Sequence, residues 1–386
     1  MVEWKKIKDV CSNICSGGTP NTKNRDYYYG DIPWLRTQEV DWGNIYDTEI
    51  KISQKGLDNS SAKIIEKDCV IVAMYGATAA KVAINKIPLS TNQACCNLKI
   101  NKDISCYRYV YYWLCKEYHK LKALGEGSQN NISGLKIKDY PIPIPSLSEQ
   151  NRIVGILDTF TDSIENLKQQ IAQRRKQYEH YRDQLLDLEG KEGVEMKKIS
   201  EIAKSYTGLT YKPENVNDTG TLVLRSSNID EDVLAFDDNV YVQMEIPERA
   251  VVHEKDLLIC VRNGSKRLVG KCAMITKHAE GMAFGAFMTI LRSIEINSKY
   301  LFYVWQSTKV KKQYKGDEAM PIAQITAKDF QRIVIPVPSQ EDQSRIVTIL
   351  DTFEASIMNL ESQLKERQKQ YEYYRNKLLS FEKEEH

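Results

Sequence analysis

The sequence predicts an α+β protein in which two globular α/β domains are separated by two long helices packed as an antiparallel coiled coil, with a pseudo-two-fold internal repeat. Three observations predict this architecture. The chain of 386 residues contains one segment twice, at an offset of 193. Both copies carry apolar residues at alternating spacings of four and three, as in a heptad. The remaining segments alternate short β-rich runs with Gly, Asn and Asp turns.

The internal repeat defines the expected domain boundaries. Residues 145–189 and 338–382 align without a gap, and 26 of 45 positions are identical. A repeat of this kind indicates duplication of a unit that consists of a variable domain and a helix. The predicted order is a first variable domain at 1–145, a first spacer helix at 146–190, a second variable domain at 191–337 and a second spacer helix at 338–386.

The two variable domains correspond more loosely than the helices. Small changes of offset between matching anchors indicate insertions in loops. The anchors are Leu35-Arg36 with Leu224-Arg225, Gly76 with Gly264, and Lys138-Asp139-Tyr140 with Lys328-Asp329-Phe330.

Each repeated segment is predicted to form one long helix. The heptad stripe runs from 153 to 188 and from 346 to 381, and the Pro-rich entries at 142–145 and 335–338 set the helix starts. Because one apolar stripe is unstable in water, the stripe of the other copy is its natural partner. The expected seam consists of Leu157, Phe160, Ile164, Leu167, Ile171, Tyr178, Leu350, Phe353, Ile357, Leu360, Leu364 and Tyr371.

Two arginines interrupt the apolar stripe. Arg174 and Arg367 occupy equivalent heptad positions, beside Tyr178 and Tyr371. They form either a polar layer that fixes the register of the helix pair, or long side chains whose charged ends reach past the tyrosines to water. The pattern leaves both interpretations open.

The variable domains combine strands with helices. The β-rich runs at 68–76, 256–264 and 332–338 predict strands, and the runs at 107–124 and 299–314 predict helices. Each variable domain is therefore expected to be α+β.

Charge is divided unevenly between the helices and the variable domains. The net charge of the chain is +2. Residues 148–189 and 341–382 each carry −2, which leaves +6 on the other 302 residues. This modest basic excess in the variable domains favours contact with a phosphate backbone.

Cysteine and histidine usage argues against a metal site. The nine cysteines include no C-x-x-C pair, and the chain has five histidines. A structural zinc ion needs clustered ligands at short spacings. We expect packed, reduced thiols and no metal. Without a signal peptide or an apolar run of about 18 residues, the protein is expected in the cytoplasm, with no membrane contact.

No catalytic residue is predicted. Asp31-Ile32-Pro33-Trp34 mimics the amine-binding loop of an amino-methyltransferase, but isoleucine replaces the first proline, and the counterpart Thr221–Leu224 could not perform that chemistry. Gly264–Cys272 is one residue too long for a phosphate-binding loop and ends in cysteine. Asp31 with Glu49 fits the carboxylate pattern of a magnesium-dependent nuclease only loosely.

Polar loops follow equivalent strands in both variable domains. Glycine lets the backbone approach a partner closely, arginine can pair with guanine, and glutamine or asparagine can pair with adenine. The alternative for each loop is a solvated turn, and for the segments at the strand ends the two interpretations are balanced. The candidate DNA-binding residues are Thr19, Arg36, Thr37, Gln38, Tyr75, Gly76, Thr78, Lys81, Asn92, Gln93, Arg225, Ser226, Asn228, Arg262, Asn263, Ser265, Lys266 and Arg267.

Several phrases carry a family resemblance. The phrase I-P-[IV]-P-x-x-x-[ED]-Q-x-x-I precedes each helix, at 142–153 and 335–346. Individually weaker phrases are Gly17-Gly-Thr-Pro20, Ile32-Pro-Trp-Leu-Arg36, Asn92-Gln-Ala94 and Gly127-Ser-Gln129-x-x-Ile-Ser133. Together with the order domain, helix, domain, helix, they make the whole chain resemble the specificity subunits of type I restriction-modification enzymes.

The resemblance implies how such a protein would work. Each variable domain would be a target recognition domain that reads one half of a split double-stranded DNA sequence. The helices would separate the domains and dock two methyltransferase subunits, which use S-adenosylmethionine to methylate adenine. Two motor-nuclease subunits, driven by ATP with Mg²⁺, could join them. No cofactor is expected on this subunit.

The second half departs from the family phrases. Asp342 replaces the usual glutamate before the helix, which is a mild change. Asn92-Gln93 is replaced by Phe284-Gly285, and the Gly-Ser-Gln phrase by residues 316–320. These changes weaken the transfer of residue roles to the second domain.

The rival interpretation is a duplicated coiled-coil adaptor that binds other proteins and no DNA. An adaptor would have no reason to place basic, Gly-punctuated loops at equivalent points of both variable domains. The loops therefore favour DNA binding.

Overall fold

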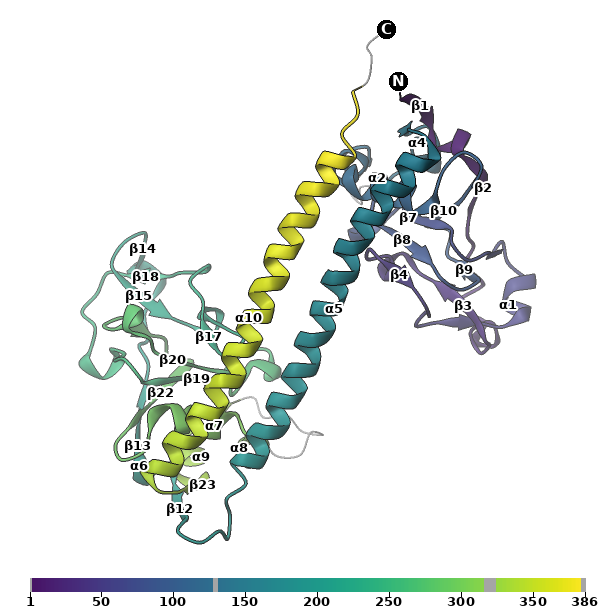
Figure 1. The fold of residues 1–386 in the computed structure, drawn as a ribbon. Coiled ribbons are helices and arrows are strands. Elements are labelled where there is room, and N and C mark those ends of the chain that lie inside the picture. Colours follow the sequence, from purple (N-terminus) through teal and green to yellow (C-terminus); the bar gives the residue numbers. More distant parts are fainter. Residues whose placement is uncertain (1, 128–130, 316–323, 383–386) are drawn as a thin grey trace. The chain divides into compact units, whose positions relative to one another are not determined.

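A computed structural model describes residues 2–127, 131–315 and 324–382 of the chain (Figure 1). Residues 128–130 of the family phrase that begins at Gly127, and all of its counterpart at 316–320, lie outside the described residues. Among the described residues, strands and helices are mixed in both halves of the chain, so the α+β prediction is confirmed.

The chain forms two compact units. Unit 1 consists of residues 1–168 and 363–386, and unit 2 consists of residues 169–362. Both boundaries fall inside long helices, so each long helix contributes one part to each unit.

Unit 1 contains three sheets among its described residues, with strand orders β1-β11, β2-β10-β7-β8-β4 and β5-β3-β9-β6. The strands are β1 (Glu3–Lys6), β2 (Cys11–Ser16), β3 (Ile32–Leu35), β4 (Asn44–Ile45), β5 (Lys51–Ile52), β6 (Ile64–Ile65), β7 (Val70–Ala73), β8 (Val82–Asn85), β9 (Leu89–Thr91), β10 (Cys95–Ile100) and β11 (Pro141–Ile144). The helices are α1 (Gln54–Asp58), α2 (Tyr107–Lys116), α3 (Tyr118–Ala123) and α4 (Gly134–Lys138), with parts of α5 (Leu147–Leu185) and α10 (Gln340–Leu378).

Unit 2 repeats this plan with sheets β12-β23, β13-β22-β19-β20, β14-β18-β15-β21 and β16-β17. The strands are β12 (Glu195–Lys198), β13 (Ala203–Thr207), β14 (Val216–Asn217), β15 (Thr221–Leu224), β16 (Ile229–Asp230), β17 (Val233–Leu234), β18 (Tyr241–Val242), β19 (Leu257–Cys260), β20 (Cys272–Met274), β21 (Ala283–Phe284), β22 (Met288–Ser293) and β23 (Val334–Val337). The helices are α6 (Ile199–Ile202), α7 (Ser298–Gln306), α8 (Thr308–Lys315) and α9 (Ala327–Arg332), with the other parts of α5 and α10.

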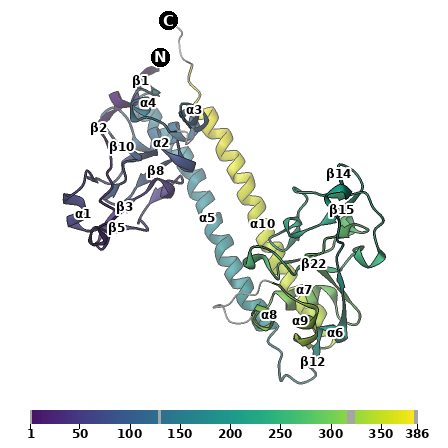
Figure 2. The same cartoon turned by 180° about the vertical axis from the view of Figure 1, so that it is seen from behind.

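The predicted strands and helices of the variable domains are present. Strands β7, β19 and β23 lie inside the three β-rich runs, and α2–α3 and α7–α8 occupy the two helical runs. In each unit a tyrosine-rich helix, α2 or α7, packs in the core between a sheet and a long helix (Figure 2). Tyr109 and Tyr112 of α2 and their counterparts Tyr300 and Tyr303 of α7 are fully buried.

One repeat anchor from the sequence is wrong. The backbone amide of Ile7 donates to the carbonyl of Tyr140, and that of Ile199 donates to the carbonyl of Ile333. Tyr140 therefore corresponds to Ile333 and not to Phe330. The similar letters in Lys138–Tyr140 and Lys328–Phe330 are a coincidence, because the register of the two-stranded sheets β1-β11 and β12-β23 decides the alignment.

A buried glutamine explains the phrase before each long helix. The side chain of Gln150 accepts a hydrogen bond from the amide of Cys106 at 2.9 Å and donates to the carbonyl of the proline five residues before it. Gln343 makes the same two bonds, with the amide of Asn297 as donor. Because buried amides need their hydrogen bonds, this residue ties the start of α5 or α10 to the start of α2 or α7.

The two long helices begin and end at equivalent residues, 193 apart. Leu157 in unit 1 and Leu350 in unit 2 are fully buried in the cores of their own units. Leu188 and Phe381, the last expected stripe positions, lie beyond the helix ends but still pack on those cores. Helix α5 ends at Leu185, earlier than the heptad pattern predicts, and the chain then turns at Gly190, which has a positive φ.

The helices run antiparallel where they meet within each unit. In unit 1 Phe160 of α5 stacks on Tyr374 of α10, and in unit 2 Tyr181 of α5 stacks on Phe353 of α10. The guanidinium of Arg367 lies over the ring of Phe160 at 5.7 Å. Early residues of one helix therefore face late residues of the other.

Each variable domain also holds its long helix through a tyrosine hydroxyl. Tyr112 donates to Asp158 of α5 at 2.6 Å, and Tyr303 donates to the equivalent Asp351 of α10 at 2.5 Å. Tyr303 also contacts Glu354 at 2.9 Å. These bonds fix the helix face that each domain covers.

Candidate nucleic-acid interface

Three of the predicted loops meet at one edge of unit 1. Strands β3 and β9 are parallel, so their carboxyl ends share an edge, where Arg36 and Asn92 follow. The amide of Asn92 donates to the carbonyl of Leu35 at 2.9 Å. The β7–β8 hairpin joins them, because the hydroxyl of Thr78 donates to the carbonyl of Thr37 at 2.8 Å.

Unit 2 forms the same edge with different side chains. Strands β15 and β21 are parallel, and the amide of Gly285 donates to the carbonyl of Leu224 at 2.9 Å. The β19–β20 hairpin is joined by the side chain of Asn263, which donates to the hydroxyl of Ser226 at 2.9 Å. Gly285 thus corresponds to Asn92, one position later than the sequence comparison places it.

A glycine lets the chain pass close to each edge. A Cβ atom on Gly17 would lie 1.9 Å from the carbonyl oxygen of Thr91, and one on Gly208 would lie 2.2 Å from that of Gly285. Any side chain there would displace the loop that follows β9 or β21. The structural requirement accounts for these glycines without a DNA contact.

The arginines at the strand ends are already paired with carboxylates. Arg36 contacts Glu49 at 2.5 Å and Glu39 at 3.5 Å, and Arg225 contacts Asp238 at 2.9 Å. A guanidinium held in this way must lose its internal partner before it can pair with a base.

Lys81 is neutralised in the same manner. Its ammonium group lies 2.5 Å from a carboxylate oxygen of Asp41, and the side chain is mostly covered. Both basic candidates of unit 1, Arg36 and Lys81, therefore have their charge paired with a carboxylate inside the protein.

Asn228 is a structural residue. It is 0% exposed, and its side-chain oxygen accepts from the amide of Arg225 at 2.9 Å. Its amide nitrogen donates to the carbonyls of Ala235 and Asp238. All its hydrogen-bonding groups are satisfied inside the protein, so we leave Asn228 out of the proposed DNA contacts.

The other candidates of unit 1 vary in exposure. Gln38 and Gln93 are exposed, while Asn92 turns its oxygen back to the amide of Ala94. Thr19 and Gln93 are hydrogen-bonded to each other. Their position brings the Gly17-Gly-Thr-Pro20 and Asn92-Gln-Ala94 phrases together, a contact that the sequence does not reveal.

The β19–β20 hairpin of unit 2 carries exposed cations. Arg262, Lys266 and Arg267 are exposed and form no salt bridge with any residue that the structure describes. Ser265 is exposed too, and its amide donates to the side chain of Asn263 in a tight turn. This loop is the most accessible basic segment among the predicted residues.

The sequence anchor between Gly76 and Gly264 is wrong. The amide of Ala80 donates to the carbonyl of Ala73 and closes the β7–β8 hairpin, and the amide of Gly270 donates to the carbonyl of Cys260 and closes the β19–β20 hairpin. Measured between these equivalent bonds, the second hairpin is three residues longer. The 3-10 turn Gly76–Thr78 corresponds to Lys266–Leu268, and Gly264 lies in the additional segment. Matching two turn glycines is misleading because a loop insertion moves them freely.

Unit 2 exposes an aromatic ring that is not among the residues predicted from the sequence. The carbonyl of Phe287 accepts from the amide of Val261 at 3.0 Å, as the carbonyl of Ala94 accepts from that of Met74. Phe287 is 57% exposed, whereas its counterpart Ala94 is buried. The sequence shows only that Phe287 lies in a loop between two β-rich runs. That its ring is exposed cannot be read from the sequence.

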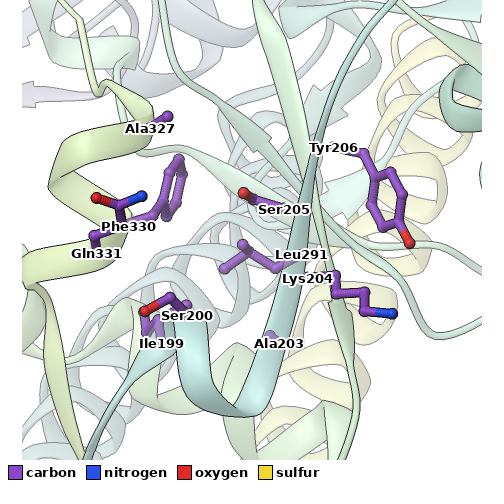
Figure 3. A pocket seen from close by; sticks show the side chains of 10 residues that line it. All are labelled: Ile199, Ser200, Ala203, Lys204, Ser205, Tyr206, Leu291, Ala327, Phe330 and Gln331. Carbon is purple, nitrogen blue, oxygen red and sulfur yellow. The ribbon is translucent and has the colours of Figure 1, made fainter.

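A cavity of about 270 Å³ lies elsewhere in unit 2, between β13 and α9 (Figure 3). Lys204, Ser205, Phe330 and Gln331 are among its lining residues, and none of the candidate DNA-binding residues lines it. The cavity is therefore separate from the three-loop edge.

Four thiols of unit 1 are buried, those of Cys69, Cys95, Cys96 and Cys115. Burial raises the pKa of Cys69 to about 11 and that of Cys11 to about 12, so both remain protonated near neutral pH. Within the part of the chain that the structure describes, no group of three His, Cys, Asp or Glu side chains could hold a metal ion. None of the helices there is long and apolar enough to cross a membrane.

Comparison with known proteins decides the family. The profile of the type I restriction modification DNA specificity domain matches residues 1–174 and 191–369, one match for each half of the repeat. The chain belongs to the type I restriction-modification specificity subunit family. As a member, it is a non-catalytic DNA-recognition subunit.

Relatives of this specificity subunit agree with the assignment. It is 33% identical to the specificity subunit of the EcoR124I/EcoR124II type I restriction enzyme of Escherichia coli, over 72% of each chain. Its fold is similar to that of a type I S subunit from M. genitalium, with a TM-score of 0.58, 17% identity and coverage of 99% and 97% of the two chains. A second similar fold, from a structure of type I R-M complex assembly, has a TM-score of 0.64 at 17% identity and covers 98% and 97%.

Proposed function

We propose that this specificity subunit reads a bipartite, asymmetric double-stranded DNA target, with one half-site for each three-loop edge. The observation that carries the proposal is the duplication of the edge with different side chains: Thr78 joins the loops in one copy and Asn263 in the other. Equivalent surfaces with unlike donors and acceptors recognise unlike base sequences. The two recognition domains would be residues 1–145 and 191–337, separated by the spacer helices 146–190 and 338–386.

The proposed DNA contacts fall into two groups. The exposed polar residues and the backbone of the loops would meet base edges, while the exposed cations would meet phosphates or guanine edges. Arg36, Lys81 and Arg225 belong to the contacts only if DNA displaces their carboxylate partners. The proposed set is Thr19, Arg36, Thr37, Gln38, Tyr75, Gly76, Thr78, Lys81, Asn92, Gln93, Arg225, Ser226, Arg262, Asn263, Ser265, Lys266 and Arg267.

The long helices would pair along the expected seam and dock two methyltransferase subunits. Met358 and Tyr373 of α10 are 64% and 59% exposed, so both are available to a partner. The methyltransferase subunits would carry S-adenosylmethionine, and two motor-nuclease subunits would carry ATP and Mg²⁺. We place the complex in the cytoplasm, where its DNA substrate would be.

Domain exchange tests the proposal. The purified subunit alone should bind DNA weakly and transfer no methyl group, whereas activity should appear when a methyltransferase subunit is added. Replacing residues 196–334 with the second domain of another family member should then change one half of the methylated motif. A change in both halves would contradict independent reading by the two domains.

The adaptor alternative predicts a different outcome. An adaptor without DNA affinity would leave the methyltransferase complex unable to bind any DNA, whatever the salt concentration. A salt titration of filter binding therefore separates the two functions, because phosphate contacts give a log-linear loss of affinity with salt.

A further inference from the structure

We propose that Arg262 reads a guanine in the half-site of unit 2 and that the ring of Phe287 is the platform that positions its guanidinium. This inference deepens the proposed DNA-reading function and rests on it. It assigns a base-reading role to one arginine of the hairpin and phosphate contacts to Lys266 and Arg267.

The backbone of Arg262 is held on two sides. Its amide donates to the carbonyl of Phe287 at 3.2 Å, next to the bond from Val261 at 3.0 Å. On the other side Arg262 forms an antiparallel bridge with Gln324. A residue fixed by its backbone in this way projects its side chain in a reproducible direction, which base reading needs and a mobile phosphate contact does not.

The side chain is held by the aromatic ring. The guanidinium carbon lies 5.3 Å from the ring centroid of Phe287, within the range of a cation–π contact. The ring is 57% exposed, so it is not a core residue. The cation–π contact orders the guanidinium without using its N–H donors, and no residue that the structure describes accepts a hydrogen bond from them.

Charge pairing distinguishes Arg262 from the arginines at the strand ends. Arg36 and Arg225 each contact a carboxylate, whereas Arg262 forms no salt bridge with the residues that the structure describes. A planar guanidinium with free donors matches the O6 and N7 acceptors of guanine, the commonest specific contact of arginine in the major groove. Arg262 therefore has both the order and the free donors that guanine reading requires.

The equivalent position in unit 1 has different chemistry. Tyr75 occupies the position equivalent to Arg262. Tyr75 follows Met74, whose amide donates to the carbonyl of Ala94, and Arg262 follows Val261, whose amide donates to the carbonyl of Phe287. Ala94 is buried and provides no ring. Unit 1 therefore lacks this device, and the inference concerns the second half-site alone.

The test uses the complete methyltransferase complex and sequencing of the sites it methylates in a random DNA library. Arg262→Lys should lose the preference for guanine at one position of one half-site, by about 5- to 150-fold, because the ammonium of lysine lacks the planar, rigid donor fork of the guanidinium. Phe287→Leu should weaken the preference for guanine at the same position by a smaller factor, and Phe287→Tyr should keep the preference of the unmodified complex. The matched control, Arg332→Lys at an exposed position of unit 2 outside the proposed contacts, should leave that position unchanged.

The outcomes separate the possibilities. An unchanged motif with Arg262→Lys overturns the proposal, and so does a uniform loss of affinity over all sequences, which would mark a phosphate contact. If Arg262→Lys weakens the preference for guanine and Phe287→Leu does not, the proposed role of the ring is overturned. The intact other half of the motif reports that each variant folds. If the unmodified complex shows no motif at all, the proposed function fails instead.

Discussion

Phe160 stacks on Tyr374 with ring centroids 5.2 Å apart and ring planes at 24°. The internal repeat maps this pair onto Phe353 and Tyr181, which stack at 5.5 Å and 29° in the other unit. Each long helix thus supplies one phenylalanine and one tyrosine, and an antiparallel arrangement pairs them in both units. The duplication of the sequence is reproduced as a duplication of the contact.

The stack should contribute a measurable coupling energy. We expect a double-mutant cycle of Phe160→Leu and Tyr374→Leu to give about 0.5–1.5 kcal/mol in the free energy of unfolding, since aromatic pairs add this much beyond burial. Denaturant unfolding followed by far-ultraviolet circular dichroism measures it. A cycle of Phe160→Leu with the exposed Met358→Leu is the control and should give coupling near zero. Equal coupling in both cycles would contradict a specific stack.

Asn228→Ala should destabilise unit 2 by about 1–3 kcal/mol and leave the methylated motif unchanged. The substitution removes the partner of the Arg225 amide and of the carbonyls of Ala235 and Asp238, all in partly buried hydrogen bonds, and unsatisfied groups of this kind carry this cost. Thermal unfolding and methylation-motif sequencing measure the two effects. Alanine at the exposed Asn217 is the control, expected to change stability little. An altered motif in a well-folded Asn228→Ala complex would return this residue to the DNA contacts.

Removing the two cations at the tip of the β19–β20 hairpin should weaken DNA binding without changing its sequence preference. Each phosphate contact adds about 0.9 to the slope of log affinity against log salt, so Lys266→Ala with Arg267→Ala should lower the slope by about 1.8. Filter binding over a range of salt measures it. The paired Lys309→Ala is the control, because Lys309 lies outside the proposed contacts and its charge is already neutralised by Asp187 and Glu189. A salt slope that stays the same would exclude both contacts.

Glu354 should make the stability of unit 2 fall as pH rises above the acidic range. Burial raises the pKa of its carboxyl, although the hydroxyls of Tyr303 and Tyr178 and the ammonium of Lys299 oppose the shift and Asp351 adds to it. Between the unfolded pKa of about 4.5 and the higher folded pKa, the folded state binds more protons. The free energy of unfolding therefore decreases with pH in this window.

Glu354→Gln should remove that part of the pH dependence. The variant should lose less stability between pH 4.5 and pH 8 than the unmodified protein, as measured by thermal unfolding across pH. Glu372→Gln, at an exposed position of the same helix, is the control and should keep the original profile. A parallel profile for both variants would contradict the role of Glu354.

The unspecified gap between half-sites should follow helix length. The chain passes from one unit to the other only through α5 and α10, so seven residues added after Ile171 and after Leu364 keep the heptad in phase. At 1.5 Å per residue the insertion lengthens each helix by about 10 Å, or up to ~3 base pairs. Because the groove turns as well, we expect an increase of one to three base pairs or loss of activity. An active variant with an unchanged gap would show that the helices do not set the spacing.

Much of the fold was determined by local patterns in the sequence. The heptad and the proline-rich entries predicted both long helices, because helix periodicity and proline conformation act between near neighbours. The 193-residue repeat predicted two equivalent units, and the β-rich runs contained strands β7, β19 and β23. The family phrase before each helix was recognisable, and the structure adds its reason, the buried Gln150 and Gln343.

Only the tertiary structure decided which candidate side chains are available to DNA. Arg36 and Arg225 look like base readers in the sequence, but Glu49 and Asp238 pair with them across 13 residues of chain. Asn228 looks polar and is fully buried, and Phe287 looks like a core residue and is exposed. Sequence spacing does not report these properties, because burial and charge pairing depend on which distant loops the fold brings to one sheet edge.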